Sequence, residues 1–146
     1  MAVLVVSCAL PSRQTGDIVV DEEAYYKYPA WRLNGLQDYE AIRVLLDEAD
    51  QLMAQQNVNA AADKLERVLR IKPDYAPAWS RLSWLALQTN SPERSIQMAK
   101  RSNSFARSNT ELQSLNWTFI RAASQQLNDN ETYQRANQKI ESLKAF

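Results

Sequence analysis

The chain has 146 residues, and its 17 basic and 17 acidic side chains give a formal net charge of zero. Such a chain has no overall basic field that would attract nucleic acid. It contains no histidine, which is the commonest metal ligand and general base, and its one cysteine excludes an internal disulfide. With only two glycines and 45% hydrophobic residues, the composition favours helices. It argues against an enzyme, a cofactor protein and a metal site.

The first eight residues combine a short apolar run with the only cysteine. Val5-Val6-Ser7-Cys8 resembles the lipobox of bacterial lipoproteins, where the signal is cut before the cysteine and the sulfur is acylated. The resemblance implies that Cys8 is lipidated and that its acyl chains bind the membrane. Ala9 after the cysteine implies sorting to the outer membrane. The run lacks a positive flank and is short, so we interpret residues 1–8 as a truncated signal. The alternative is an incidental apolar start with an inert cysteine.

Residues 9–34 are predicted to be a flexible linker that ends in an aromatic segment. Pro11–Glu23 shows no periodicity and is rich in polar and turn residues. Ala24–Trp31 carries four aromatic residues in eight. We expect these aromatics to cap the open end of the first helical hairpin, because stacked repeats need their ends protected. A partner-binding motif is the alternative. The helical domain is predicted over residues 35–146.

The stretch Ala60–Trp79 shows how the helical domain is built. An apolar stripe with helical spacing is followed by Pro73, which cannot continue a helix, and Trp79 then opens a second stripe. This order of small residue, apolar face, proline and tryptophan resembles a tetratricopeptide repeat. The resemblance implies an all-α, TPR-like solenoid of three helical hairpins. The residues of the two stripes are Ala61, Leu65, Val68 and Leu69, then Trp79, Leu82 and Leu85.

Three copies of the repeat pattern can be aligned, over residues 42–75, 76–109 and 110–146. Trp79 follows Leu45 by 34 residues, whereas Ile120 follows Trp79 by 41, so we expect an elongated helix beginning near Asn109. Small residues stand where the two helices of a hairpin should nearly touch: Ala49, Ser83 and Ser124. Glu48 replaces the usual leucine, and Arg107 stands where proline is expected. The predicted helix caps include Asn59, Asn109 and Asn130.

No group of residues signals catalysis. The acidic runs at 21–23 and 47–50 lack calcium-loop spacing, and there is no nucleotide-binding motif. We interpret the acidic runs as solvated faces. Lys100, Arg101 and Arg107 near Phe105 are interpreted as a solvated helix end, with a minor anionic contact as the alternative. We predict no catalytic residue, no cofactor, no metal and no nucleic acid.

The resemblance implies that the first helices of the hairpins form an inner face that receives a protein or peptide. Trp84 is the central candidate there, unless it packs beneath the aromatic segment. The basic and asparagine residues that clamp a carboxylate in chaperone-binding members are absent, which argues against a heat-shock cochaperone. Carried over residue by residue, the predicted binding positions are Arg43, Leu46, Asp50, Met53, Ser80, Trp84, Leu87, Gln88, Arg121, Gln125 and Asn128.

The sequence therefore predicts a non-catalytic protein-interaction module. We expect it to be an outer-membrane lipoprotein on the periplasmic side, attached to the membrane only through its lipid anchor, that binds and regulates a cell-envelope protein. It resembles the short lipoprotein activators of bifunctional peptidoglycan synthases (class A penicillin-binding proteins). The alternative is a soluble cytoplasmic scaffold or assembly adaptor.

Overall fold

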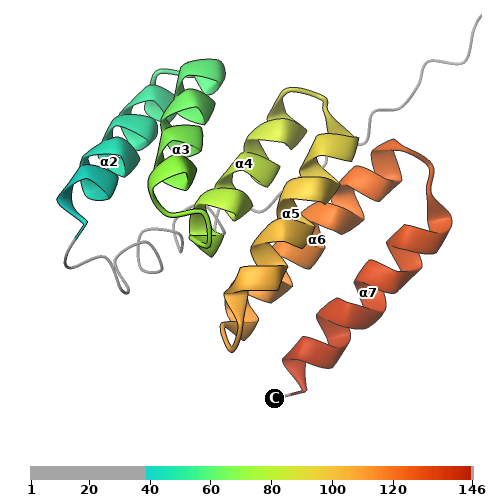
Figure 1. Cartoon of the computed structure of the whole chain (residues 1–146). Coiled ribbons are helices and arrows are strands. Elements are labelled where there is room, and N and C mark those ends of the chain that lie inside the picture. Colours follow the sequence, from blue (N-terminus) through green and yellow to red (C-terminus); the bar gives the residue numbers. More distant parts are fainter. Residues whose placement is uncertain (1–38, 146) are drawn as a thin grey trace, which may run out of the picture.

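The computed structural model describes residues 39–145, which form a stack of three helical hairpins (Figure 1). The all-α solenoid of three hairpins predicted from the sequence is confirmed. Cys8, the linker 9–34 and the aromatic segment Ala24–Trp31 lie outside the described residues. The helices are α2 (Glu40–Ala54), α3 (Val58–Ile71), α4 (Ala76–Gln88), α5 (Pro92–Ala106), α6 (Thr110–Gln126) and α7 (Asn130–Lys144).

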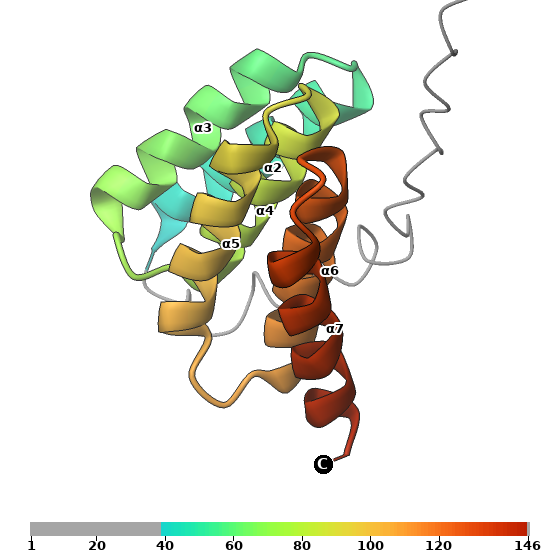
Figure 2. The same cartoon turned by 90° about the vertical axis from the view of Figure 1, so that its right-hand side faces the viewer.

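The hairpins follow one another across the molecule, and each helix packs against the next (Figures 1 and 2). We call α2, α4 and α6 the A helices, and α3, α5 and α7 the B helices. Among the described residues α4 also contacts α6, whereas α5 and α7 make no comparable contact. Because α4 and α6 approach each other more closely than α5 and α7 do, the A helices lie on the inner side of this part of the stack. We call the surface of the A helices the inner face.

Two main apolar clusters hold the stack together. The first is built on the stripe predicted for α3, where Ala61, Leu65 and Val68 are at most 1% exposed. It also includes the inward side chains of α2 and Ala78, Leu82 and Leu85 of α4. The second cluster joins the end of α4 to α5, α6 and α7. It contains Leu87, Ala99, Phe119, Ile120, Ala122, Ala123 and Ala136.

Small residues lie where the A and B helices of each hairpin approach most closely. In the second hairpin the hydroxyl of Ser83 donates to the carbonyl of Ser95 at 2.8 Å and lies 2.9 Å from its hydroxyl oxygen. Both serines are completely buried. Ala49 and Ser124 are buried at the matching positions of the other hairpins. A larger side chain would force α4 and α5 apart, so the predicted reason for a small residue is confirmed in the second hairpin.

The seven extra residues before the third repeat lengthen α6, as predicted. This helix has 17 residues, and the side chain of Asn109 caps it by accepting a hydrogen bond from the amide of Leu112. Leu112 packs with Ala76 and Ala106 of the second hairpin. Phe119, further along α6, packs in the second cluster. The longer helix therefore extends the contact with the second hairpin.

Both departures from the family pattern have a physical reason. Glu48 is partly exposed, and its carboxylate pairs with the ammonium of Lys64 at 2.6 Å, so it links α2 to α3 across their edge. Arg107 has a φ of 46°, which the proline ring cannot adopt. The side chain of Gln113 donates to the Arg107 carbonyl and holds this turn.

Two predicted helix caps are wrong. The cap of α3 is Asn57, two residues before the predicted Asn59, and its side-chain oxygen accepts an amide proton in the first turn. The cap of α7 is Asp129 instead of Asn130. Hydrogen bonds from Thr132 lower the pKa of the Asp129 carboxyl. Asn57 and Asp129 each follow the positive-φ residue of the turn between two helices. The geometry of this turn therefore determines which residue caps the next helix.

The three turns between A and B helices share one backbone motif. In the first turn the amide of Gln56 donates to the carbonyl of Met53, and the amide of Asn57 donates to that of Leu52. This pair of bonds is the Schellman motif, which needs a residue with positive φ after the helix. Gln56, Asn90 and Asn128 occupy that position with φ between 54° and 59°. The same short turn therefore joins every hairpin.

Gln56→Gly is expected to stabilise the protein. A residue with a β-carbon is strained at the φ of 59° that Gln56 adopts, and glycine is not. We expect the free energy of unfolding in urea to rise by about 0.5–1 kcal/mol. The neighbouring Gln55 has a φ of −89°, so Gln55→Gly is a matched control that should not stabilise. Equal effects of the two substitutions would contradict this assignment of strain.

Candidate protein-binding face

Six of the predicted binding residues remain accessible on the A helices. Arg43, Gln88 and Gln125 are exposed, and Asp50, Met53 and Trp84 are partly buried. They come from all three A helices, so a partner lying across the inner face would meet each hairpin. Asn128 is exposed in the turn after α6. The binding role of these residues stays a prediction.

Three predicted binding residues are core residues, and their prediction as surface residues is wrong. Leu46 is 1% exposed, Ser80 2% and Leu87 7%. Leu46 belongs to the first apolar cluster and Leu87 to the second. The reason for Ser80 and Leu87 is the position of α4, which contacts α3, α5 and α6, so that ten of its 13 residues are buried. Only a narrow strip of α4 is left for a partner.

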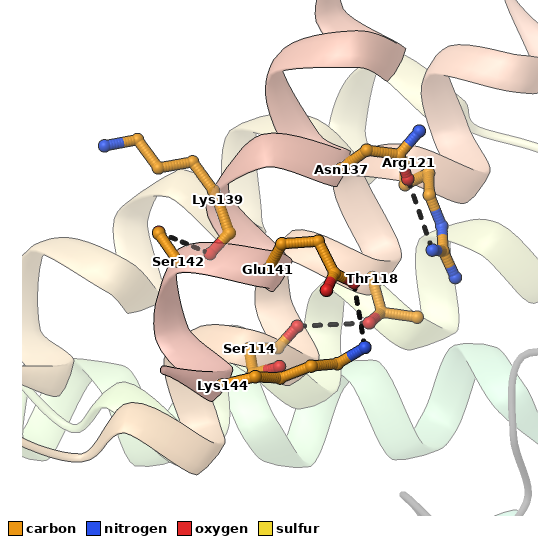
Figure 3. A network of polar contacts seen from close by, with 8 residues as sticks. All are labelled: Ser114, Thr118, Arg121, Asn137, Lys139, Glu141, Ser142 and Lys144. Carbon is orange, nitrogen blue, oxygen red and sulfur yellow. Dashed lines mark hydrogen bonds and ion pairs between the residues drawn. The ribbon is translucent and has the colours of Figure 1, made fainter. Parts of the chain in front are cut away.

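Arg121 also differs from its predicted position on the inner face. Its guanidinium donates to the side-chain oxygen of Asn137 at 3.3 Å and thus lies between α6 and α7, as Figure 3 shows. In the same view Lys144 pairs with Glu141 along α7. The outward side chains of α7 are mostly polar, and only Ala136 and Ile140 are buried. A polar outer helix suits the end of a stack of repeats.

The most structured part of the inner face is a cluster of Asp50, Arg81 and Trp84. The guanidinium of Arg81 lies 3.5 Å from the carboxylate of Asp50, which joins α4 to α2. The same guanidinium lies over the Trp84 ring, 5.1 Å from its centre. Arg81 is 6% exposed, whereas Asp50 and Trp84 are only partly buried. The buried cation therefore holds an acidic and an aromatic side chain in place at the surface.

Arg81 was missed by the sequence reasoning, although part of its signal was present. Arg81 and Trp84 are three residues apart, a spacing that makes neighbours on one helix face. Asp50 and Trp84 are 34 residues apart and so occupy the same position in consecutive repeats. These two spacings predict that the three side chains share one face. The depth at which the guanidinium lies depends on the packing of α2 against α4, which the pattern does not give.

Trp84 contributes to the apolar core as well as to the accessible inner face. It packs against both apolar clusters. Truncation of a tryptophan in such a position costs about 3–5 kcal/mol. A loss of binding in a Trp84→Ala variant would thus include a loss of folding. Exposed neighbours are better probes of the inner face.

Within residues 39–145, no three carboxylates or other metal-binding side chains lie close enough to hold a metal ion. No helix in this range is both long and apolar enough to cross a membrane. What the described residues offer is a helical surface with polar, acidic and aromatic side chains.

Comparison with known proteins agrees with this architecture. The sequence model of the tetratricopeptide repeat family matches residues 52–115. This part of the chain therefore carries tetratricopeptide repeats. The match runs from the end of α2 to the middle of α6 and includes the whole second hairpin. Searches of curated proteins and of solved structures return no match.

The family gives the coarse function. Tetratricopeptide repeats are typically non-catalytic scaffolds that mediate binding of protein partners. The A-helix surface of this repeat protein is the candidate for that binding.

Proposed function

We propose that this tetratricopeptide repeat protein is a non-catalytic module that binds a protein partner on its inner face. The observation that carries the proposal is the Asp50–Arg81–Trp84 cluster. Tryptophan and arginine dominate the binding energy of protein interfaces when they are held in a fixed position. Here the contact with Arg81 orients the partly exposed Trp84, and the A helices also present exposed polar side chains at Arg43, Gln88 and Gln125. Aromatic residues and arginine are enriched in protein-binding sites.

We further propose that Cys8 anchors this module to the outer membrane, on the periplasmic side. The support is the lipobox-like Val5-Val6-Ser7-Cys8 and the polar stretch that follows it. The partner we name is a bifunctional peptidoglycan synthase of the class A penicillin-binding protein type, which the module would bind and activate. This choice rests on the resemblance to short lipoprotein activators, in which a linker lets a small domain reach its enzyme.

The anchor is tested by metabolic labelling with a fatty acid in the bacterial cell. The full-length precursor should incorporate label, and the Cys8→Ala variant should not, because the thiol is the acylated group. Cell fractionation should place the labelled protein in the outer membrane. Absence of label in the unchanged protein would overturn the anchor and favour a soluble cytoplasmic scaffold.

The inner face is tested with a Gln88→Arg, Gln125→Arg double variant. Both glutamines are exposed, so the change should alter stability by less than about 0.5 kcal/mol. The two long cations should obstruct a partner and weaken its binding about tenfold or more. The measurement is binding of the full chain to a purified class A penicillin-binding protein from the same cells.

A control carries one arginine on α7, as Gln138→Arg, and should bind like the unchanged protein. Equal loss in this control would contradict the inner-face assignment. A further informative result is that the synthase fails to bind, while another envelope protein binds the unchanged chain but not the double variant. That result would exclude the synthase and support the inner face as a protein-binding site.

A further inference from the structure

A second surface combines basic and aromatic side chains at one end of the hairpins. We call it the edge strip and define it as Tyr39, Lys72, Trp79, Arg101, Phe105 and Arg107. It lies where α3 and α5 end and where α2 and α4 begin, along the edge that carries the α3–α4 and α5–α6 turns (Figure 1). Only Trp79 of the edge strip lies within an A helix, and none of the inner-face binding residues belongs to the strip. Binding at the edge strip therefore goes beyond the function proposed above.

A chain of contacts runs through the edge strip from Tyr39 to Phe105. The Lys72 ammonium lies 5.6 Å from the centre of the Tyr39 ring and 3.1 Å from the Asp74 carboxylate. The Trp79 indole N–H donates to the Pro73 carbonyl at 2.8 Å, which fixes its ring beside this turn. The guanidinium of Arg101 then lies 5.7 Å from the Trp79 ring centre.

Arg101 is held between two aromatic rings, since its guanidinium is also 5.1 Å from the centre of the Phe105 ring. Arg101 is exposed, while Trp79 and Phe105 are partly buried. Tyr39 is 39% exposed. A partner can therefore reach a guanidinium that is already oriented and the aromatic surfaces next to it. Pre-orientation lowers the entropic cost of binding, and aromatic residues and arginine are enriched in protein interfaces.

The charges of the edge strip indicate which kind of partner it can bind. Asp74 is its one carboxylate among the contacts just described, and Lys72 lowers the pKa of that carboxyl through a hydrogen bond. Lys72 and Arg107 both act on the Asp74 carboxyl, and with Arg101 the three cations outnumber this one carboxylate by two. This small excess of cations favours a few carboxylates over a polyphosphate, whose binding needs many cation contacts and would be opposed by Asp74.

We propose that the edge strip binds an acidic polypeptide segment that carries aromatic side chains. Carboxylates of the segment pair with Arg101 and Arg107, and its rings pack against Trp79, Phe105 and Tyr39. Arg101 is the centre of this surface because it alone contacts two of the rings within the edge strip. Arg101 and Arg107 are exposed, and the proposal develops the anionic contact that the sequence left open as the alternative here.

The probe is a short fluorescein-labelled peptide that alternates glutamate and tyrosine, titrated with the full chain and followed by fluorescence anisotropy. We expect saturable binding that weakens about tenfold in Arg101→Glu, since attraction is replaced by repulsion. The matched control is Arg135→Glu, the same charge change at an exposed arginine of α7, which should leave binding unchanged. A peptide that alternates lysine and tyrosine should not bind.

Circular dichroism tests whether the Arg101→Glu variant is folded. If that variant is unfolded, the titration is repeated with Arg101→Gln. Lack of saturable binding, or equal effects of the Arg101 and Arg135 variants, would overturn the proposal. Tighter binding of a single-stranded oligonucleotide than of the peptide would also overturn it, in favour of a polyanion site. Because Arg101 belongs to α5, whereas the inner-face variant changes α4 and α6, this result is independent of the synthase-binding test.

Discussion

The close approach of two helices at small residues is the constraint on which the rest of this structure depends. Ser83 and Ser95 meet in the middle of the second hairpin with 2.9 Å between their hydroxyl oxygens, and neither is accessible to solvent. Their polar groups satisfy each other, so a small polar residue can replace alanine at this position without an unpaired buried hydroxyl. Matching buried positions in the other hairpins carry Ala49 and Ser124. Each hairpin is thereby narrow enough for the next one to stack on it.

Stacking decides which residues remain for binding. The A helices lie on the inner side of the stack, and α4 is covered by three neighbouring helices. Leu87 therefore belongs to the core, whereas Trp84 on the same helix keeps part of its surface. The buried Arg81 connects these two roles, because it ties α4 to Asp50 of α2 and orients Trp84. The same packing leaves the ends of the hairpins open, where Arg101 lies between Trp79 and Phe105.

Most of the fold could be predicted because each structural position recurs in three repeats, so the residue types at that position can be compared. The small residues, the stripe on α3 and the long α6 all follow from spacing. The spacing did not reveal which polar side chains are buried. Asn116 lies in register with the buried Leu112 and Phe119, is completely buried, and donates to the hydroxyl of Ser102 at 2.8 Å. Like Arg81, it is polar and yet buried, since its partner comes from another helix. Residue type alone assigns such side chains to the surface.

Replacing Ser83 with leucine tests the central claim most directly. If close approach at Ser83 and Ser95 holds the hairpins together, Ser83→Leu should lower the free energy of unfolding in urea by about 3 kcal/mol, through overpacking and the lost hydrogen bonds. Ser104→Leu makes the same change at an exposed position of α5 and should have an effect below about 0.5 kcal/mol. Equal stability of the two variants would contradict the account.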